Sequence, residues 1–313
     1  MFAIVQKERS IILQSDTSSA EIWPWHGGIL NQWTVKLGTN EWQIVDGYAT
    51  QGDFEQHCEQ LGFKGCKLSP YVCRINHSEY LFGEKRYKIG RFELAGNALH
   101  GLLYDQPFSI IASDANDDKA VVELQYDYKA TDAGYPFTYS ISLIYELEPH
   151  NKLTITTKVT NTHSEAIPIC DGWHPYFSLG KKVDDLQLEI NANSALAFDD
   201  RMIPTGSIKA DKRFENPILL NNISLDDCFV LHEPSDKPAA RLINLEDNLQ
   251  LSIFAITGYP YLQIYTPDHR KSIAIENLSA APDAFNNKMG LTLLGPGQCK
   301  MFVCSYATGA ATT

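Results

Sequence analysis

The chain has 313 residues, of which 44% are apolar, so it is long and apolar enough to bury a large core and form a globular protein. Its formal net charge is -12 and its pI is near 5.2. This charge argues against nucleic acid or an anionic membrane as the partner and suits a neutral small ligand. No apolar run approaches the roughly 20 residues of a membrane-spanning helix.

The N-terminus and the cysteines indicate a reducing compartment. Met1 to Arg9 become charged at Lys7 and lack the long apolar segment of a secretion signal. The seven cysteines are odd in number and contain no Cys-x-x-Cys pair, which fits reduced thiols better than a disulfide framework or a zinc site. We therefore expect a cytoplasmic protein without a bound metal.

The first third of the chain predicts strands and one short helix. Met1 to Ser15 resemble a strand pair, and Trp23 to Gly28 predict a turn in which His26 is a turn residue. The alternating segment Ile29 to Leu37 predicts a further strand. Asp53 to Leu61 is one of the few segments compatible with a helical period of 3.6 residues.

The rest of the chain has a period of two and is rich in Val, Ile, Thr and Tyr, which favours strands. No alternation with long helical segments is present, so we expect one all-β domain over residues 1–313, a large antiparallel β-sandwich. The tail, Ala307 to Thr313, is expected to fray. The predicted strands are Tyr80–Phe82, Phe108–Ala112, Val121–Tyr128, Phe137–Leu147, Leu153–Asn161, Leu186–Ile190, Leu249–Ile256, Leu262–Tyr265, Ile273–Ile275 and Met301–Tyr306.

Acidic clusters in this chain predict turns and not metal sites. Ser113 to Lys119 begins like a calcium-binding loop, but the sixth position from Asp114 is Lys119 where that loop needs glycine. We expect a solvated hairpin turn there. Asp184-Asp185 and Asp199-Asp200 also have the character of turn residues.

The segment from Asp171 to Leu179 has the composition of a ligand site. It holds His174 between Trp173 and Tyr176, whose flat faces suit a sugar ring, and a histidine can exchange protons near neutral pH. The alternative is a structural histidine at a strand end. A second candidate is Glu276, which follows the apolar run Ile273 to Ile275; a carboxylate there is either paired or functional, and burial would raise its proton affinity.

The chain resembles the aldose 1-epimerases, or galactose mutarotases. The resemblance runs through most of the sequence and is carried by several short motifs in the family's order. These are Arg74 in Pro70–Ile75, His100 in Leu99-His100-Gly101, His174 in His174-Pro175-Tyr176-Phe177, Asp226 before Phe229-Val230-Leu231, and Glu276, followed by Ala281–Asn286.

The resemblance implies a cofactor-free enzyme on a large β-sandwich that interconverts the α and β anomers of an aldose. Glu276 would take the proton from the hydroxyl on C1, and His174 would protonate the ring oxygen as the ring opens. After rotation about C1–C2, the same pair with reversed roles would close the ring. No metal or nucleotide is implied.

The remaining site residues would bind the sugar. His100 and Arg74 would hold hydroxyls or the ring oxygen, Asp226 would accept from hydroxyls, Tyr176 would offer a ring face, and Gln263 is a weaker match to a sugar-binding glutamine. The sequence leaves alternatives for two of these positions. Arg74 can be explained as a structural ion pair, and Asp227 competes with Asp226 for the sugar contact.

Two departures from the family pattern, Leu102 and Asn277, bear on the substrate more than on the mechanism. The first rival function is a hexose-6-phosphate epimerase, which needs cations for the phosphate. The second is a carbohydrate-binding or sensing protein without turnover, although such a protein requires neither His174 nor Glu276. The natural sugar and the oligomeric state stay open at this point.

Overall fold

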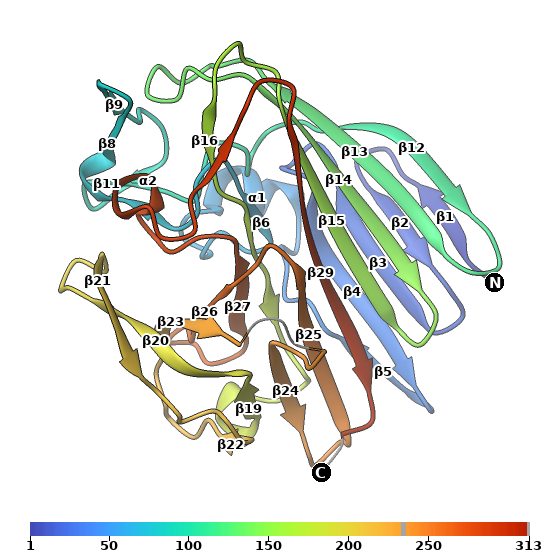
Figure 1. Ribbon diagram of the computed structural model, residues 1–313. Helices are drawn as coiled ribbons and strands as arrows, with labels where there is room; N and C mark the ends of the chain where they lie inside the picture. Colours follow the sequence, from blue (N-terminus) through green and yellow to red (C-terminus); the bar gives the residue numbers. More distant parts are fainter. Residues whose placement is uncertain (233–235, 312–313) are drawn as a thin grey trace.

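The computed structural model describes residues 1–232 and 236–311, which form mostly antiparallel strands with few short helices. This confirms the predicted all-β sandwich. Figure 1 shows the N-terminal strands β1 to β4 running alongside β12 to β15, with the C-terminal strand β29 next to β15.

The N-terminal sheet has strands in chain order, each antiparallel to the next. The first strand pair and the segment 29–37 are thereby confirmed. Its strands are β1 (Ala3–Gln6), β2 (Ile11–Gln14), β3 (Ser18–Trp23), β4 (Ile29–Leu37) and β5 (Asn40–Gln43).

The large sheet combines the middle and the end of the chain. The C-terminal strand lies at its centre, between β15 and β25. In spatial order the sheet consists of β12 (Ser109–Ala115), β13 (Ala120–Tyr128), β14 (Tyr139–Glu148), β15 (Lys152–Asn161), β29 (Cys299–Gly309), β25 (Leu249–Thr257), β24 (Ala240–Asn244), β19 (Gln187–Ile190) and β22 (Ile218–Leu219).

A third sheet, which we call the site sheet, carries most of the candidate site residues. The short strand β18 (Tyr176–Phe177) pairs with β27 beside β17. In spatial order the site sheet consists of β21 (Pro204–Ala210), β20 (Ala192–Phe198), β23 (Asp226–Leu231), β26 (Tyr261–Tyr265), β27 (Ile273–Leu278), β17 (Gly172–His174) and β6 (Cys66–Leu68).

Smaller elements cover the site end of the molecule. They are the sheet β10 (Glu93–Leu94), β11 (Asn97–Leu99) and β7 (Arg74–Ile75), the hairpin β8 (Glu79–Phe82) and β9 (Lys85–Lys88), the pair β16 (Ile167–Ile169) and β28 (Thr292–Leu294), the helices α1 (Gln51–His57) and α2 (Ala284–Asn287), and the 3₁₀ turns η1 (Asn76–Ser78) and η2 (Val183–Asp185).

Alternating burial explains the large sheet. Along β14 every second residue, from Tyr139 to Leu147, is buried, while its neighbours are partly exposed. This is the pleat of a strand with one face on the core. The turn between β12 and β13 spans 116–119, where Asn116 Oδ1 accepts from the amides of Asp118 and Lys119, so the predicted solvated hairpin turn is confirmed.

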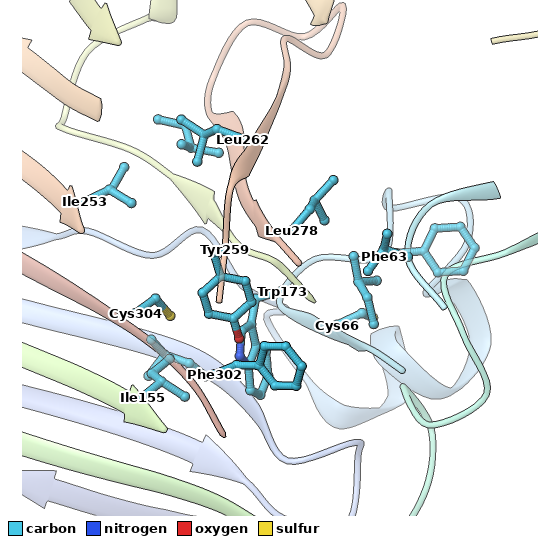
Figure 2. Close-up of a cluster of buried hydrophobic side chains, with 14 of the residues drawn as sticks. Phe63, Cys66, Ile155, Trp173, Ile253, Tyr259, Leu262, Leu278, Phe302 and Cys304 are labelled. Carbon is cyan, nitrogen blue, oxygen red and sulfur yellow. The ribbon is translucent and has the colours of Figure 1, made fainter. Parts of the chain in front are cut away.

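The core includes buried residues of the N-terminal sheet, the large sheet and the site sheet. Figure 2 shows Trp173 and Tyr259 grouped with Phe302 and Cys304 of β29. The Trp173 ring also meets the ring of Tyr145 on β14 at 6.0 Å. The site sheet is therefore supported from below by rigid, close-packed apolar side chains.

Two predicted boundaries were wrong. The helix begins at Gln51, earlier than Asp53, because Thr50 and Asp53 form a capping box, and it ends at His57, before Leu61. After Cys58 the chain turns back, with the Phe63 amide donating to the Cys58 carbonyl at 2.8 Å. The tail does not fray at 307–309, because β29 continues to Gly309 between β15 and β25; residues 312–313 lie outside the described part.

Candidate active site

The polar side chains of the site share one face of the site sheet. Gln263 of β26 lies directly opposite Glu276 of β27, and Cys228 of β23 lies opposite Gln263. Directly paired residues point to the same face. Asp226 precedes Cys228 by two residues and shares that face as well.

Glu276 lies within a strand and not after its end as the sequence suggested. β27 extends to Leu278 and is buried along its whole length. The apolar run ends at Ile275, but the backbone ladder continues through Glu276 and Asn277, which pair with Gln263 and Leu262. A polarity change at Glu276 therefore does not mark the end of the strand.

His174 lies beside Glu276 on the neighbouring strand. β17 and β18 run along β27 as one strand interrupted at Pro175, with Gly172 opposite Leu278 and Tyr176 opposite Ala274. This register brings His174 Nε2 to 3.3 Å from Glu276 Oε1. Gly172 permits the close pairing, since an added Cβ would come within 2.9 Å of the Leu278 side chain.

The pKa values of the two groups are shifted because both side chains are buried, with 7% of His174 and 3% of Glu276 exposed. Burial, assisted by the charge of Arg74, lowers the pKa of His174 to about 4. Burial and the nearby Asp226 raise the pKa of Glu276 well above its ordinary range, against the opposing effect of Arg74. These shifts favour the uncharged form of each group, a neutral imidazole at His174 and a protonated carboxyl at Glu276.

Arg74 and His100 come from a second sheet that closes over the pair. β7 and β11 place Arg74 opposite Leu99, and the His100 ring meets the His174 ring edge-on at 4.9 Å. Burial, followed by the charges of His174 and Arg74, lowers the pKa of His100 well below its usual range. Arg74 makes no ion pair with the described residues, so its charge remains available within the site.

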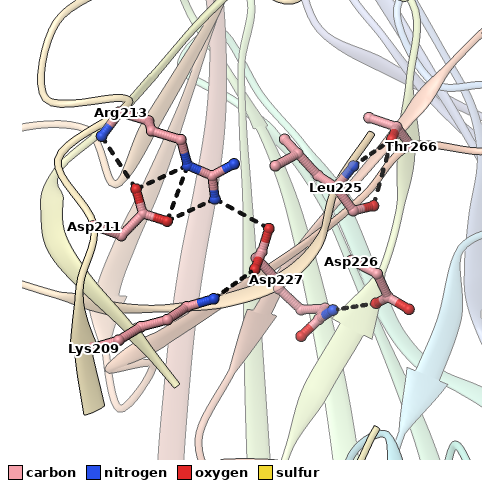
Figure 3. Close-up of polar contacts among 8 residues, drawn as sticks. Lys209, Asp211, Arg213, Leu225, Asp226, Asp227 and Thr266 are labelled. Atoms are coloured by element: carbon pink, nitrogen blue, oxygen red, sulfur yellow. Dashed lines mark hydrogen bonds and ion pairs between the residues drawn. The ribbon is translucent and has the colours of Figure 1, made fainter. Parts of the chain in front are cut away.

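The geometry separates Asp226 from Asp227. Asp226 Oδ1 accepts from Gln263 Nε2 at 2.7 Å on the face of Glu276. Asp227 points to the other face, where its oxygens lie 3.5 Å from Lys209 Nζ and 3.2 Å from Arg213, as Figure 3 shows. Of the two carboxylates, Asp226 is the one directed toward His174 and Glu276.

Tyr176 forms a wall between the pair and a neighbouring groove. Its ring stacks on the His174 ring at 5.3 Å with an interplanar angle of 20°. Beyond it lies a groove of about 1160 Å³, which is also lined by Tyr265, Lys64 and Trp42. This groove adjoins the pair without enclosing it.

Several buried polar atoms of the site have no partner among the described residues. They are Nδ1 of His174, Nδ1 of His100, Oε2 of Glu276 and Oε1 of Gln263. Buried polar groups are almost always hydrogen-bonded, so a cluster of unpartnered atoms marks a place where a polar ligand belongs.

Sequence reasoning missed the ion pair beneath the site. Lys67 of β6 and Asp171 are fully buried and in contact, Lys67 also bonds Thr157 Oγ1 at 3.1 Å, and the Tyr259 hydroxyl donates to Asp171 at 2.8 Å. Lys67 is the direct strand partner of Trp173. Asp171 begins the segment that was singled out, but nothing in the sequence identified its partner, which lies 104 residues away.

Phe63 is a second residue that sequence reasoning missed. Its ring packs against the His100 ring with centroids 4.7 Å apart, and its φ of 54° lies in the left-handed region. Non-glycine residues with positive φ concentrate at functional sites. His100, with a φ of 59°, shares this feature. The backbone signal cannot be recognised in a sequence, because phenylalanine and histidine usually adopt negative φ.

Residues 1–232 and 236–311 contain no group of three or more His, Cys, Asp or Glu side chains arranged to hold a metal ion. Over the same residues, no helix combines the length and the apolar character needed to cross a membrane.

The fold is that of the galactose mutarotase-like sandwiches. A galactose mutarotase-like protein from Clostridium acetobutylicum superposes with a TM-score of 0.88 at 22% identity, covering 99% of each chain. Galactose 1-epimerase from Lactobacillus acidophilus NCFM superposes with a TM-score of 0.82 at 17% identity, covering 100% of this chain and 99% of the other.

Sequence comparison also assigns the chain to a family. The aldose 1-epimerase family profile matches residues 9–307, and the chain belongs to that family. The chain is 26% identical over 298 residues to an aldose 1-epimerase of Streptococcus thermophilus, covering 84% of this chain and 83% of the relative. It is also 25% identical over 245 residues to the uncharacterised protein YihR of Escherichia coli K12, covering 76% and 77% of the two chains.

Proposed function

We propose that the protein is a mutarotase that interconverts the α and β anomers of a free aldohexose. The observation that carries the proposal is the buried contact of 3.3 Å between His174 and Glu276. Ring opening requires proton removal from the C1 hydroxyl and proton delivery to the ring oxygen. Both oxygens are attached to C1, so an acid and a base that serve them must stand close together.

In this proposal Glu276 is the base and His174 the acid. The reactive pair carries one proton, which His174 holds while Glu276 is ionised. Polar sugar hydroxyls entering the site would reduce the cost of charging both groups, and Arg74 favours the ionised form of Glu276. The same pair with exchanged roles recloses the ring on the other carbonyl face.

The surrounding residues are assigned to sugar binding. Asp226 and Gln263, already joined by a hydrogen bond, would hold one or two hydroxyls, while His100 and Arg74 would bind on the opposite side. Tyr176 would present its ring to the sugar and hold the imidazole of His174 in place. The mechanism needs no cofactor, because each step is a proton transfer or a bond rotation.

The proposal includes a cytoplasmic location and a substrate without phosphate. All seven cysteines are free thiols in the structure, which suits a reducing compartment. The basic cluster before His100 lies on the β8–β9 hairpin, where Arg86 and Lys88 contact Glu79 and Lys85 lies over the Tyr87 ring. A 6-phosphate sugar would find Arg74 as the available cation of the site.

Polarimetry tests the proposal directly. Freshly dissolved α-glucose, α-galactose and other aldoses should reach their equilibrium rotation faster with the purified protein, and prior treatment with a chelator should leave the rate unchanged. A protein that binds these sugars without accelerating the change would instead support the carbohydrate-binding alternative. Loss of activity on metal removal, restored by one metal, would contradict the proposed mechanism.

A further inference from the structure

Two thiols lie in contact at the edge of the site. Cys58, the C-terminal cap of α1, and Cys66, the first residue of β6, have their sulfur atoms 3.8 Å apart. The hydroxyl of Tyr48 donates to Cys58 Sγ at 3.3 Å. Bond formation requires the sulfurs to close from this separation to about 2 Å, which displaces one or both cysteines.

The two thiols differ in access. Cys58 is partly exposed and lines a cavity of about 510 Å³ beside His26 and Tyr104, whereas Cys66 is fully buried. The hydrogen bonds from Cys66 and Tyr48 lower the pKa of the Cys58 thiol against the effect of burial. Burial raises the pKa of Cys66 well above its ordinary range. An accessible thiol beside a buried partner is the arrangement of an attacking and a resolving cysteine.

The segment between these cysteines touches the candidate site at several points. Cys66 is the strand partner of His174, and the Gly65 amide donates to the His174 carbonyl at 2.8 Å. Phe63 packs on His100, and Gly62 lies against the Tyr176 hydroxyl, which is 2.7 Å from where a Cβ of Gly62 would stand. A shift of the segment 58–66 must therefore disturb the residues around the catalytic pair.

We infer that Cys58 and Cys66 form a site of reversible oxidation, in which a hydroperoxide converts the two thiols into a disulfide that alters the adjoining active site. The thiolate of Cys58 attacks one peroxide oxygen and the O–O bond breaks. The other oxygen departs as hydroxide, and Cys58 becomes a sulfenic acid. The Cys66 sulfur then attacks this sulfenic sulfur, and the departing hydroxide takes the Cys66 proton as water. Two thiols lose two electrons, and hydrogen peroxide becomes two water molecules.

The disulfide can be detected without any enzyme assay. Trypsin cleaves after Lys36, Lys64 and Lys67, so Cys58 lies in peptide 37–64 and Cys66 in peptide 65–67, and neither peptide holds another cysteine. After treatment of the reduced protein with hydrogen peroxide and blocking of free thiols, we expect these peptides to run as one linked species that dithiothreitol separates. The inference would be overturned if the two peptides were recovered separately, each with a blocked thiol, after a peroxide treatment that had oxidised the exposed Cys299.

Mutarotation then measures the effect on the site. We expect oxidation to lower kcat/KM by about tenfold or more, because a misplacement of roughly 1 Å can cost about 10²-fold. Dithiothreitol should restore it, which methionine oxidation would not allow. Cys58→Ser and Cys66→Ala should each resist the loss, and Cys299→Ser, an exposed thiol away from the pair, should lose activity like the native chain. A linked peptide with unchanged kcat/KM would overturn the coupling to the site.

Discussion

At the scale of single residues, the site is costly to the folded state. His174 and Glu276 are ionisable groups held where burial disfavours their charged forms, and each keeps a nitrogen or an oxygen without a partner among the residues that the structure describes. Such groups reduce stability unless a ligand satisfies them. A pair of this kind is explained by chemistry more readily than by folding.

The first prediction concerns the catalytic pair. His174→Asn and Glu276→Gln should each lower kcat for mutarotation by about 10²-fold or more, since general acid–base groups contribute roughly 10² to 10⁴. Both variants should fold, because amides of similar shape replace the side chains. Polarimetry of freshly dissolved glucose gives the rates.

Asp227→Asn is the matched control, since Asp227 points away from the pair toward Lys209 and Arg213. It should keep kcat within about twofold of the native value, because an exposed ion pair contributes roughly 1 kcal/mol or less and makes no contact with the sugar. If Glu276→Gln retained nearly full activity, the base would have to be sought at Asp226.

The second prediction is a pH dependence of stability that arises from His174. Its folded pKa of about 4 lies below its ordinary value of 6.5, so between these values the unfolded chain binds more protons. Stability is therefore present above pH 6.5 and is lost as the pH falls toward 4. The full shift corresponds to about 3 kcal/mol at roughly 1.4 kcal/mol per pKa unit.

Urea unfolding of the native chain and of His174→Asn, at pH 7 and near pH 4, tests this dependence. The variant should lose less stability than the native chain on acidification, by up to about 3 kcal/mol. Equal losses in the two proteins would show that His174 is already protonated in the folded state, and the assignment of a neutral imidazole would then be abandoned.

At the scale of elements, the strand that carries His174 is held from both sides. β17 pairs with β27 above the core and with β6, whose Lys67 meets Asp171 immediately before β17. The Lys67 ammonium also lies 4.3 Å from the Trp173 ring centroid. The buried ion pair is therefore placed to fix the position of the strand that carries His174, the proposed acid.

The third prediction compares the removal of one charge of the Lys67–Asp171 ion pair with the removal of both. Asp171→Leu should destabilise the protein by about 3 to 5 kcal/mol, because it leaves the Lys67 ammonium buried without its carboxylate. The double variant Lys67→Met with Asp171→Leu should recover most of this loss, since neither charge remains. Urea denaturation with linear extrapolation gives both values. A double variant as unstable as the single one would contradict the account.

At the scale of the whole molecule, charge favours a neutral substrate. The chain carries a net charge of -12, and several cations near the site end contact carboxylates: Arg91 meets Asp105 at 2.9 Å, and Arg86 meets Glu79 at 3.2 Å. A phosphate monoester brings about -1.5 to -2 charges near pH 7 and requires cations to offset its desolvation. Among the candidate site residues, Arg74 supplies such a cation.

The fourth prediction follows from this distribution. The ratio of kcat/KM for glucose to that for glucose 6-phosphate, measured in one buffer, should exceed one, because the acidic molecule repels the phosphate. Lys85→Ala with Arg86→Ala should leave the ratio unchanged, since both side chains are exposed on the β8–β9 hairpin. A tenfold preference for the phosphate that this double variant abolishes would overturn the choice of substrate.

The amino-acid sequence by itself determined the class of fold and the composition of the site. Alternating apolar residues predicted strands such as β13, β14 and β15, because a period of two results from the pleat itself. The motifs around His174 and Glu276 were found because their residue types are unusual beside apolar strands. Short elements such as β16 and β18 were missed, since two or three residues carry no measurable period.

Only the tertiary structure decided which residues meet. Lys67 and Asp171 are 104 residues apart in the chain, and Asp226 is distinguished from Asp227 by the face of β23 on which each side chain lies. The contacts of Cys58 with Cys66 and of Phe63 with His100 depend on a turn whose backbone has positive φ. Local patterns fix the direction of a side chain relative to its own strand, whereas its partners follow from the packing of strands that are distant in sequence.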